Sequence, residues 1–160
     1  MIMSYSKKQR QIDFVLKNIT NVLEREKIEY LKDEKNLKIS FSVNKCLKAD
    51  FVFKINSEKM LVSIISKIPY IVKQDKIEDL AAAICFINNF TANGCFDFDI
   101  NTGEILFRMT NGFLESLIGE EAYEYMIDCS VNMLIEYSEQ LILLARGLIS
   151  LDEFVDRNGI

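Results

Sequence analysis

Apolar residues along this 160-residue chain recur at two spacings, and each spacing predicts a different kind of element. Between residues 6 and 27 they recur every three or four positions, which is typical of an amphipathic helix. The apolar stripe of this helix consists of Ile12, Val15, Leu16, Ile19, Val22 and Leu23. From residue 37 to 43 apolar and polar residues alternate instead, which predicts a β-strand with one buried face.

Two further segments, 50–55 and 60–68, continue the strand pattern, and a turn at 56–59 separates them. A less regular strand is predicted at 28–31. We expect these segments to form an antiparallel meander that ends at Pro69, because proline has no N–H to donate to a strand ladder.

A second helix is predicted from Asp75 to about residue 92. The Asp75 carboxylate is placed to cap the free amides of the first turn, and Glu78 stands at the capping-box position. Its packing stripe consists of Ile77, Leu80, Ile84, Ile87 and Thr91. The alanines Ala81–Ala83 give this helix a thin side that a sheet or a partner can approach closely. Gly94 is expected to end the helix in a left-handed conformation.

The stretch 96–109 has two interpretations. Acidic and amide side chains alternate ahead of Gly103, as they do at the start of a calcium-binding loop. However, an EF-hand loop that starts at Asp97 has Arg108 at its twelfth position, where a bidentate acid is required. The flanking residues also alternate as strands do. We therefore predict a hairpin turned at 101–103, without a metal site, in which Arg108 offsets the charge of one aspartate.

The last long helix is predicted from Gly119 to Gly147, followed by a short one that opens at Ser150 with Glu153 in a capping box. The polar residues of the long helix form one narrow stripe, which consists of Glu120, Glu124, Asp128, Asn132 and Glu136. One sheet face does not cover the rest of its surface, so either the first helix or a second subunit must pack there. We predict a homodimer that uses the second half of the chain. The acidic stripe is either a solvated face or a docking site for a cationic segment.

Composition and charge exclude several kinds of chemistry. The chain has no histidine, which excludes Ser-His-Asp and Cys-His nucleophile systems and the helical HExxH zinc site. The net charge of -5 is unevenly distributed, with 16 lysines or arginines against 11 acids in residues 1–80 and 3 against 13 in residues 81–160. The acidic half and the dispersed lysines of the basic half argue against a nucleic-acid partner.

Cysteine spacing and hydropathy indicate the cellular compartment and the redox state in which we expect the protein. The four cysteines contain no CxxC pair, so we expect buried, reduced thiols and neither a disulfide framework nor a zinc site: Cys46, Cys85, Cys95 and Cys129. No apolar run is long enough to cross a bilayer, and the first ten residues lack the apolar core of a secretory signal. We expect one domain over residues 1–160 of a cytoplasmic protein that has no membrane partner.

Two segments of the sequence resemble a known family. Residues 62–109, "VSIISKIPYIVKQDKIEDLAAAICFINNFTANGCFDFDINTGEILFRM", resemble the central signature of YbjN-like proteins, and residues 135–154, "IEYSEQLILLARGLISLDEF", resemble their C-terminal part. The resemblance implies an α+β fold like that of type III secretion chaperones, in which an antiparallel sheet packs with helices in the order α-β(3 or 4)-α-β(2)-α. Members of this bacterial family are provisionally classed as sensory-transduction regulators, and the fold often forms dimers.

These observations predict a non-catalytic protein-binding or regulatory module that needs no cofactor. A dedicated, acidic, dimeric client chaperone of the type III secretion kind is one alternative, and an enzyme that uses lysine, tyrosine or carboxylate chemistry is another. The partner is expected to be a second copy of the chain or a protein or peptide client. The residues that we predict to bind it all lie on the last long helix: Met133, Tyr137, Leu141, Glu124 and Asp128.

Overall fold

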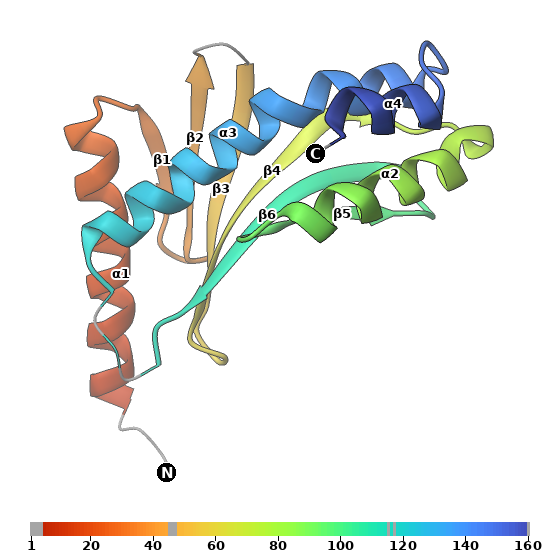
Figure 1. Cartoon of the computed structure of the whole chain (residues 1–160). Coiled ribbons are helices and arrows are strands. Elements are labelled where there is room, and N and C mark those ends of the chain that lie inside the picture. The colour runs from red at the N-terminus through yellow and green to blue at the C-terminus, as the bar shows by residue number, and fades with distance from the viewer. Residues whose placement is uncertain (1–4, 45–47, 115, 117, 160) are drawn as a thin grey trace.

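The computed structural model describes residues 5–44, 48–114, 116 and 118–159. Helices and strands alternate along these residues in the predicted order (Figure 1). The elements are α1 (Tyr5–Arg25), β1 (Tyr30–Asp33), β2 (Lys38–Asn44), β3 (Lys48–Asn56), β4 (Leu61–Ile71), the 3-10 helix η1 (Gln74–Lys76), α2 (Ile77–Phe90), β5 (Cys95–Asp99), β6 (Glu104–Gly112), α3 (Glu120–Ala145) and α4 (Leu151–Asn158). The predicted α+β class is confirmed.

The six strands form one antiparallel sheet with the order β1-β2-β3-β4-β6-β5. Their register places residues of like character side by side on each face. On the buried face, one row runs through Ile39, Phe53, Ile64 and Met109. Each of these side chains is at most 5% exposed, so the row forms the centre of the core.

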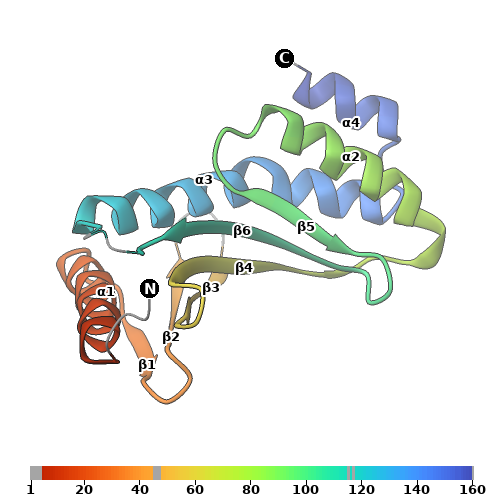
Figure 2. The ribbon, with the colours of Figure 1, turned by 90° about the horizontal axis from the view of Figure 1, so that it is seen from below.

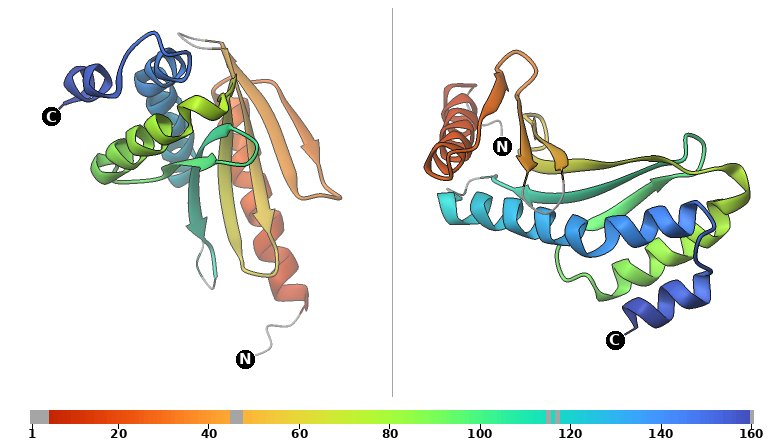
Figure 3. Two further views of the ribbon diagram at one scale, coloured as in Figure 1. Left: turned by 90° about the vertical axis from the view of Figure 1, so that its right-hand side faces the viewer. Right: turned by 90° about the horizontal axis from the view of Figure 1, so that it is seen from above.

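The helices cover one face of the sheet, which curves around α1 and α3 (Figures 2 and 3). Helix α3 lies against β4 and β6, α2 lies beside β5, and α4 packs on α2 and α3. Helix α1 packs against α3. Along β4, buried residues alternate with half-buried or exposed ones, in keeping with an opposite face of the sheet that no helix of the described residues covers.

The packing of α3 decides between two alternatives left open by the sequence. The wide apolar surface of this helix is covered by α1, α2, α4 and the sheet, so no second subunit is needed to bury it. Seven of its apolar residues are core residues, among which Tyr123, Met126 and Leu144 are fully buried, and others such as Val131, Met133 and Ile142 pack partly buried against the core. The capping box that begins α4 is confirmed, since the Ser150 side chain accepts from the Glu153 N–H and the Glu153 carboxylate accepts from the Ser150 N–H.

Two predicted boundaries are wrong. The meander does not end at Pro69, because β4 continues to Ile71 and Pro69 falls where the register between β4 and β6 shifts. A break in the ladder removes the need for the N–H that proline lacks. The predicted cap of the second helix is also wrong, because Asp75 lies in η1 and Lys76 is the N-cap of α2, without a side-chain hydrogen bond.

The end of α2 and the cysteines also differ from expectation. Thr91 already has an extended backbone, so the helix ends before Gly94, whose φ of +81° serves the turn into β5. The described cysteines are free but not buried: Cys85 is exposed on α2, and Cys95 and Cys129 are half-buried. The prediction of buried thiols is therefore wrong for all three, and Cys46 lies outside the described residues.

Candidate partner-binding surfaces

The hairpin of β5 and β6 forms as predicted, with Phe96 paired to Phe107 and Gly103 in the turn at φ +72°. Its carboxylates have protein partners. Asp97 accepts from the Arg108 guanidinium at 2.6 Å, and Asp99 accepts from two backbone N–H groups of the turn, which lowers its pKa. In the part of the chain that the structure describes, no three acidic or cysteine side chains are grouped to hold a metal ion.

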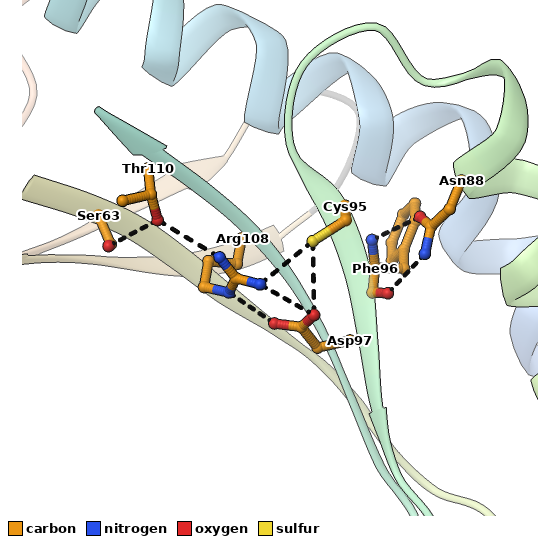
Figure 4. Close-up of polar contacts among 7 residues, drawn as sticks. All are labelled: Ser63, Asn88, Cys95, Phe96, Asp97, Arg108 and Thr110. Carbon is orange, nitrogen blue, oxygen red and sulfur yellow. Dashed lines mark hydrogen bonds and ion pairs between the residues drawn. The ribbon is translucent and has the colours of Figure 1, made fainter. Parts of the chain in front are cut away.

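A chain of polar side chains crosses the helix-free face of the sheet from β4 to β5 (Figure 4). Ser63 and Thr110 share a hydrogen bond of 2.8 Å, and Arg108 donates to Thr110, to Asp97 and to the sulfur of Cys95. Burial, followed by the charge of Asp97, raises the pKa of the Cys95 thiol. This thiol therefore remains protonated near neutral pH, so the cluster ties strands together and does not form a nucleophile.

Polar side chains of α1 fasten the segment that leads into α3. The Asn18 amide donates to the Ile118 carbonyl at 2.9 Å, and the Gln11 amide donates to the Phe113 carbonyl at 3.4 Å. Both side chains are buried next to the apolar stripe of α1. The sequence contained a signal for these contacts, because Gln11 and Asn18 lie two helical turns apart beside the apolar stripe, and buried amides need hydrogen-bond partners. We nevertheless assigned no role to either residue.

The first half of the acidic stripe also contacts α1. Arg25 donates to the Glu120 carboxylate at 2.9 Å and to the Glu124 carboxylate at 2.8 Å, and Asn21 donates to Glu120 at 2.7 Å. These pairs are partly exposed, so each stabilises the fold by about 0.5 kcal/mol at most. Their main consequence is that Glu124 is already partly neutralised, whereas Asp128, one turn further on, is exposed and has no salt bridge.

Glu124 and Asp128 border a hollow of about 80 Å³ between α1, α3 and the end of β2, which we call the acidic groove. It is lined by Val22, Glu26, Ile28, Val43, Glu124, Ile127, Asp128 and Val131. The floor is apolar, because Val22, Val43 and Ile127 are at most 7% exposed. Glu26 and Asp128 are exposed at the rim, so the groove combines an apolar floor with a negatively charged border.

A larger depression adjoins the acidic groove where β1 and β2 separate. It has a volume of about 970 Å³, is lined by residues 27–31, 40–43 and 50–52, and shares Ile28 and Val43 with the groove. It forms because β1 begins at Tyr30, opposite Phe41, so the last residues of β2 have no neighbour on that side. We call this depression the notch.

The structure separates the five residues predicted to bind a partner. Glu124 and Asp128 lie together at the acidic groove. Leu141 is fully buried and belongs to the core, so it is not available at the surface. Met133 is partly buried against the core, and Tyr137 packs edge-on against Phe96 with ring centroids 6.1 Å apart. Burial raises the pKa of Tyr137, in keeping with a packing role.

Comparison with known proteins shows what the fold is. No family model matches the sequence, and no curated protein matches it. Among solved structures, a chain of the HopA1–SchA chaperone–effector complex matches with 8% identity over 79% of this chain and 94% of its own length, at a TM-score of 0.58. The fold is that of a type III secretion chaperone.

Two further structures have the same fold. A chain of the ExsC–ExsE complex matches with 15% identity over 79% of this chain and 92% of its own, at a TM-score of 0.56. YbjN from E. coli, a provisionally assigned transcription regulator, matches with 12% identity over 82% of this chain and 91% of its own, also at 0.56. The expected YbjN-like fold is therefore confirmed. No helix among the described residues is long and apolar enough to span a membrane.

Proposed function

We propose that this protein is a non-catalytic module that binds an extended segment of another protein, as a chaperone does. The observation that carries the proposal is the acidic groove, which places an apolar hollow beside the exposed carboxylates of Glu26 and Asp128, of which Glu26 lies 3.9 Å from the Arg25 guanidinium. Burying an aliphatic side chain there is favourable by about 25 cal/mol for each Å² removed from water. The shared fold with a chain of a chaperone–effector complex supports the same conclusion.

The dimensions and charge of the groove suggest the chemistry of the partner. A volume of about 80 Å³ suits one aliphatic side chain, and the rim carboxylates of Glu26 and Asp128 suit a lysine or arginine next to it. The adjoining notch leaves room for the backbone of the same segment. We therefore expect a segment in which apolar and basic residues alternate, so that one kind enters the hollow and the other faces the rim.

A charge reversal tests the role of the rim. Asp128→Lys is compared with Glu139→Lys, because both replace an exposed acid on α3 and only Asp128 lines the groove. The probe is a synthetic peptide of alternating leucine and lysine, titrated into each protein by calorimetry. Asp128→Lys should weaken binding at least tenfold, and Glu139→Lys should bind as the wild type does. Equal binding by the two variants would contradict the proposal.

The natural partner is identified by affinity capture from the native cell with the same three proteins. A protein that binds the acidic groove should co-purify with the wild type and with Glu139→Lys but not with Asp128→Lys. The recombinant partner segment should then raise the thermal midpoint of the wild type, since a ligand of the native state stabilises it. If Asp128→Lys still captures the partner, the partner binds elsewhere on the protein, and the acidic groove is not its binding site.

We further propose that the protein is a homodimer, although the original reason, an uncovered α3, no longer applies. The support is the set of apolar side chains that remain exposed in the second half of the chain, among which Phe90, Leu114 and Leu148 are each more than half exposed. Light scattering over a dilution series tests this proposal. A mass that stays near 18.5 kDa at all concentrations would rule it out.

A further inference from the structure

Strand β5 lies at one edge of the sheet. Its residue Phe96 is hydrogen-bonded through its backbone to a side chain of α2, on the side where a further strand would otherwise pair. The Asn88 amide of α2 donates to the Phe96 carbonyl at 2.9 Å, and its carbonyl oxygen accepts from the Phe96 N–H, also at 2.9 Å (Figure 4). Two residues of adjacent antiparallel strands exchange the same two bonds. Because a side-chain amide has the donor and acceptor of a peptide group, Asn88 imitates one residue of a seventh strand.

Because of the hydrogen bonds to Asn88, few backbone groups on the outer side of β5 are free to pair with another strand. Along an antiparallel strand, the N–H and C=O of alternate residues point to alternate sides. Since those of Phe96 point away from β6, those of Phe98 do so as well, and the groups of the residues between them point toward β6. Within Cys95–Asp99 only Phe96 and Phe98 therefore face outward, and Asn88 occupies one of the two.

The rest of this edge would suit another strand. A hollow of about 420 Å³ lies between α2 and β5, lined by Ala81, Cys85, Asn88, Phe98, Ile100 and others. Ile100 is 58% exposed beside it, and this edge has neither the proline nor the lysine that commonly prevents strand pairing. A second chain could thus add side chains to the hollow if its backbone could pair with Phe96.

We propose that Asn88 closes the β5 edge to strand pairing and so prevents the chain from associating through this edge. The proposal does not depend on the acidic groove, which lies between α1, α3 and β2. It assigns a function to an asparagine that has no part in the core. It also distinguishes Asn88 from its neighbour Asn89, whose exposed side chain makes no hydrogen bond to the described residues.

The test compares the wild type, Asn88→Ala and the matched control Asn89→Ala. In light scattering over a dilution series, Asn88→Ala should begin to exceed the wild-type mass at a protein concentration at least tenfold below any at which the wild type or Asn89→Ala does so. Adding Ile100→Lys, which places a charge on the exposed edge, should return Asn88→Ala to the wild-type mass. Far-UV circular dichroism checks that each variant is folded.

Amide hydrogen exchange provides a second readout. In the wild type the Phe96 amide should exchange slowly, because Asn88 accepts its proton. In Asn88→Ala with Ile100→Lys, which is expected not to associate, the same amide should exchange at least tenfold faster while the core of β6 is unchanged. The proposal is overturned if Asn88→Ala keeps the wild-type mass at every concentration, or if Phe96 remains equally protected in the double variant.

Discussion

Tyr123 places a hydroxyl group where the described residues offer it no partner. The side chain is fully buried near the start of α3 and packs edge-on against Phe53, with ring centroids 6.3 Å apart. Its hydroxyl oxygen makes no hydrogen bond to this part of the chain. Burial alone raises the pKa of this group to about 12. We therefore expect Tyr123→Phe to stabilise the protein, which is unusual for a change in the core.

The size of the gain follows from two opposing terms. A buried hydroxyl without a partner costs about 1–3 kcal/mol of desolvation, and its removal forfeits the contacts of one oxygen atom, about 0.5 kcal/mol in total. The net expectation is a gain of about 1 kcal/mol in the free energy of unfolding. For a chain of this length, that gain raises the thermal midpoint by about 2–4 °C. Urea unfolding and calorimetry at pH 7 measure both quantities.

The pH dependence distinguishes this cause from a change in packing. The pKa of Tyr123 is raised from 10.0 in the unfolded chain to about 12 in the native state. Between these values the unfolded chain loses a proton that the native state keeps, so wild-type stability falls as pH rises, by about 1.4 kcal/mol for each pH unit. Tyr123→Phe lacks this loss, so its advantage should grow above pH 10. A less stable variant would show that the hydroxyl has a partner, and an advantage that stays constant above pH 10 would show that burial does not raise the pKa of Tyr123.

Three further predictions concern the β5–β6 turn, the N-terminal cap of α4 and calcium binding by the hairpin. Gly103→Val should lower the free energy of unfolding in urea by about 2 kcal/mol or more. The reason is that φ of Gly103 is +72° and a Cβ there would lie 2.6 Å from the Val72 carbonyl oxygen. An unchanged urea midpoint would show that Gly103 does not need this conformation. Ser150→Ala should cost about 1 kcal/mol in the same assay. The pKa of Glu153 is lowered mainly by the backbone N–H of residue 150, which alanine keeps, so NMR titration should show this pKa rising only by the smaller part that the Ser150 hydroxyl contributes. Adding Ca²⁺ should leave the thermal midpoint unchanged, whereas a saturable rise at micromolar Ca²⁺ would show that the hairpin binds the ion.

Local patterns predicted most of the elements because the physics behind them is local. The stripe from Ile12 to Leu23 and the alternation from Ile39 to Val43 each specify a buried face without reference to the rest of the chain. The hairpin around Gly103 was predictable for the same reason, since turn residues and strand alternation agree there. The resemblance to YbjN-like proteins then supplied the fold, an antiparallel sheet packed with helices, but not the order of the strands in the sheet.

Contacts between distant residues were not predictable in the same way. The cap assigned to Asp75 failed because a 3-10 turn moved the start of α2 by two residues, and nothing in the local sequence distinguishes these two starts. The acidic groove needs Glu26, which directly follows α1, and Asp128 from α3, and only the packed fold brings these two residues together. The stripe itself predicted that Asp128 would be exposed, but it did not indicate that Glu124 would be held by Arg25.

The fastening of α1 has a consequence for synthesis on the ribosome. The bonds from Gln11, Asn18 and Arg25 reach partners 95 to 102 residues later in the chain. At about 5–20 residues per second, the partners are made roughly 5–20 s after the helix itself. Throughout that interval the apolar stripe of α1 has no α3 to pack against, so the nascent chain exposes it to whatever lies near the ribosome exit. The amide side chains along this helix become fixed only when the acidic half of the protein has emerged.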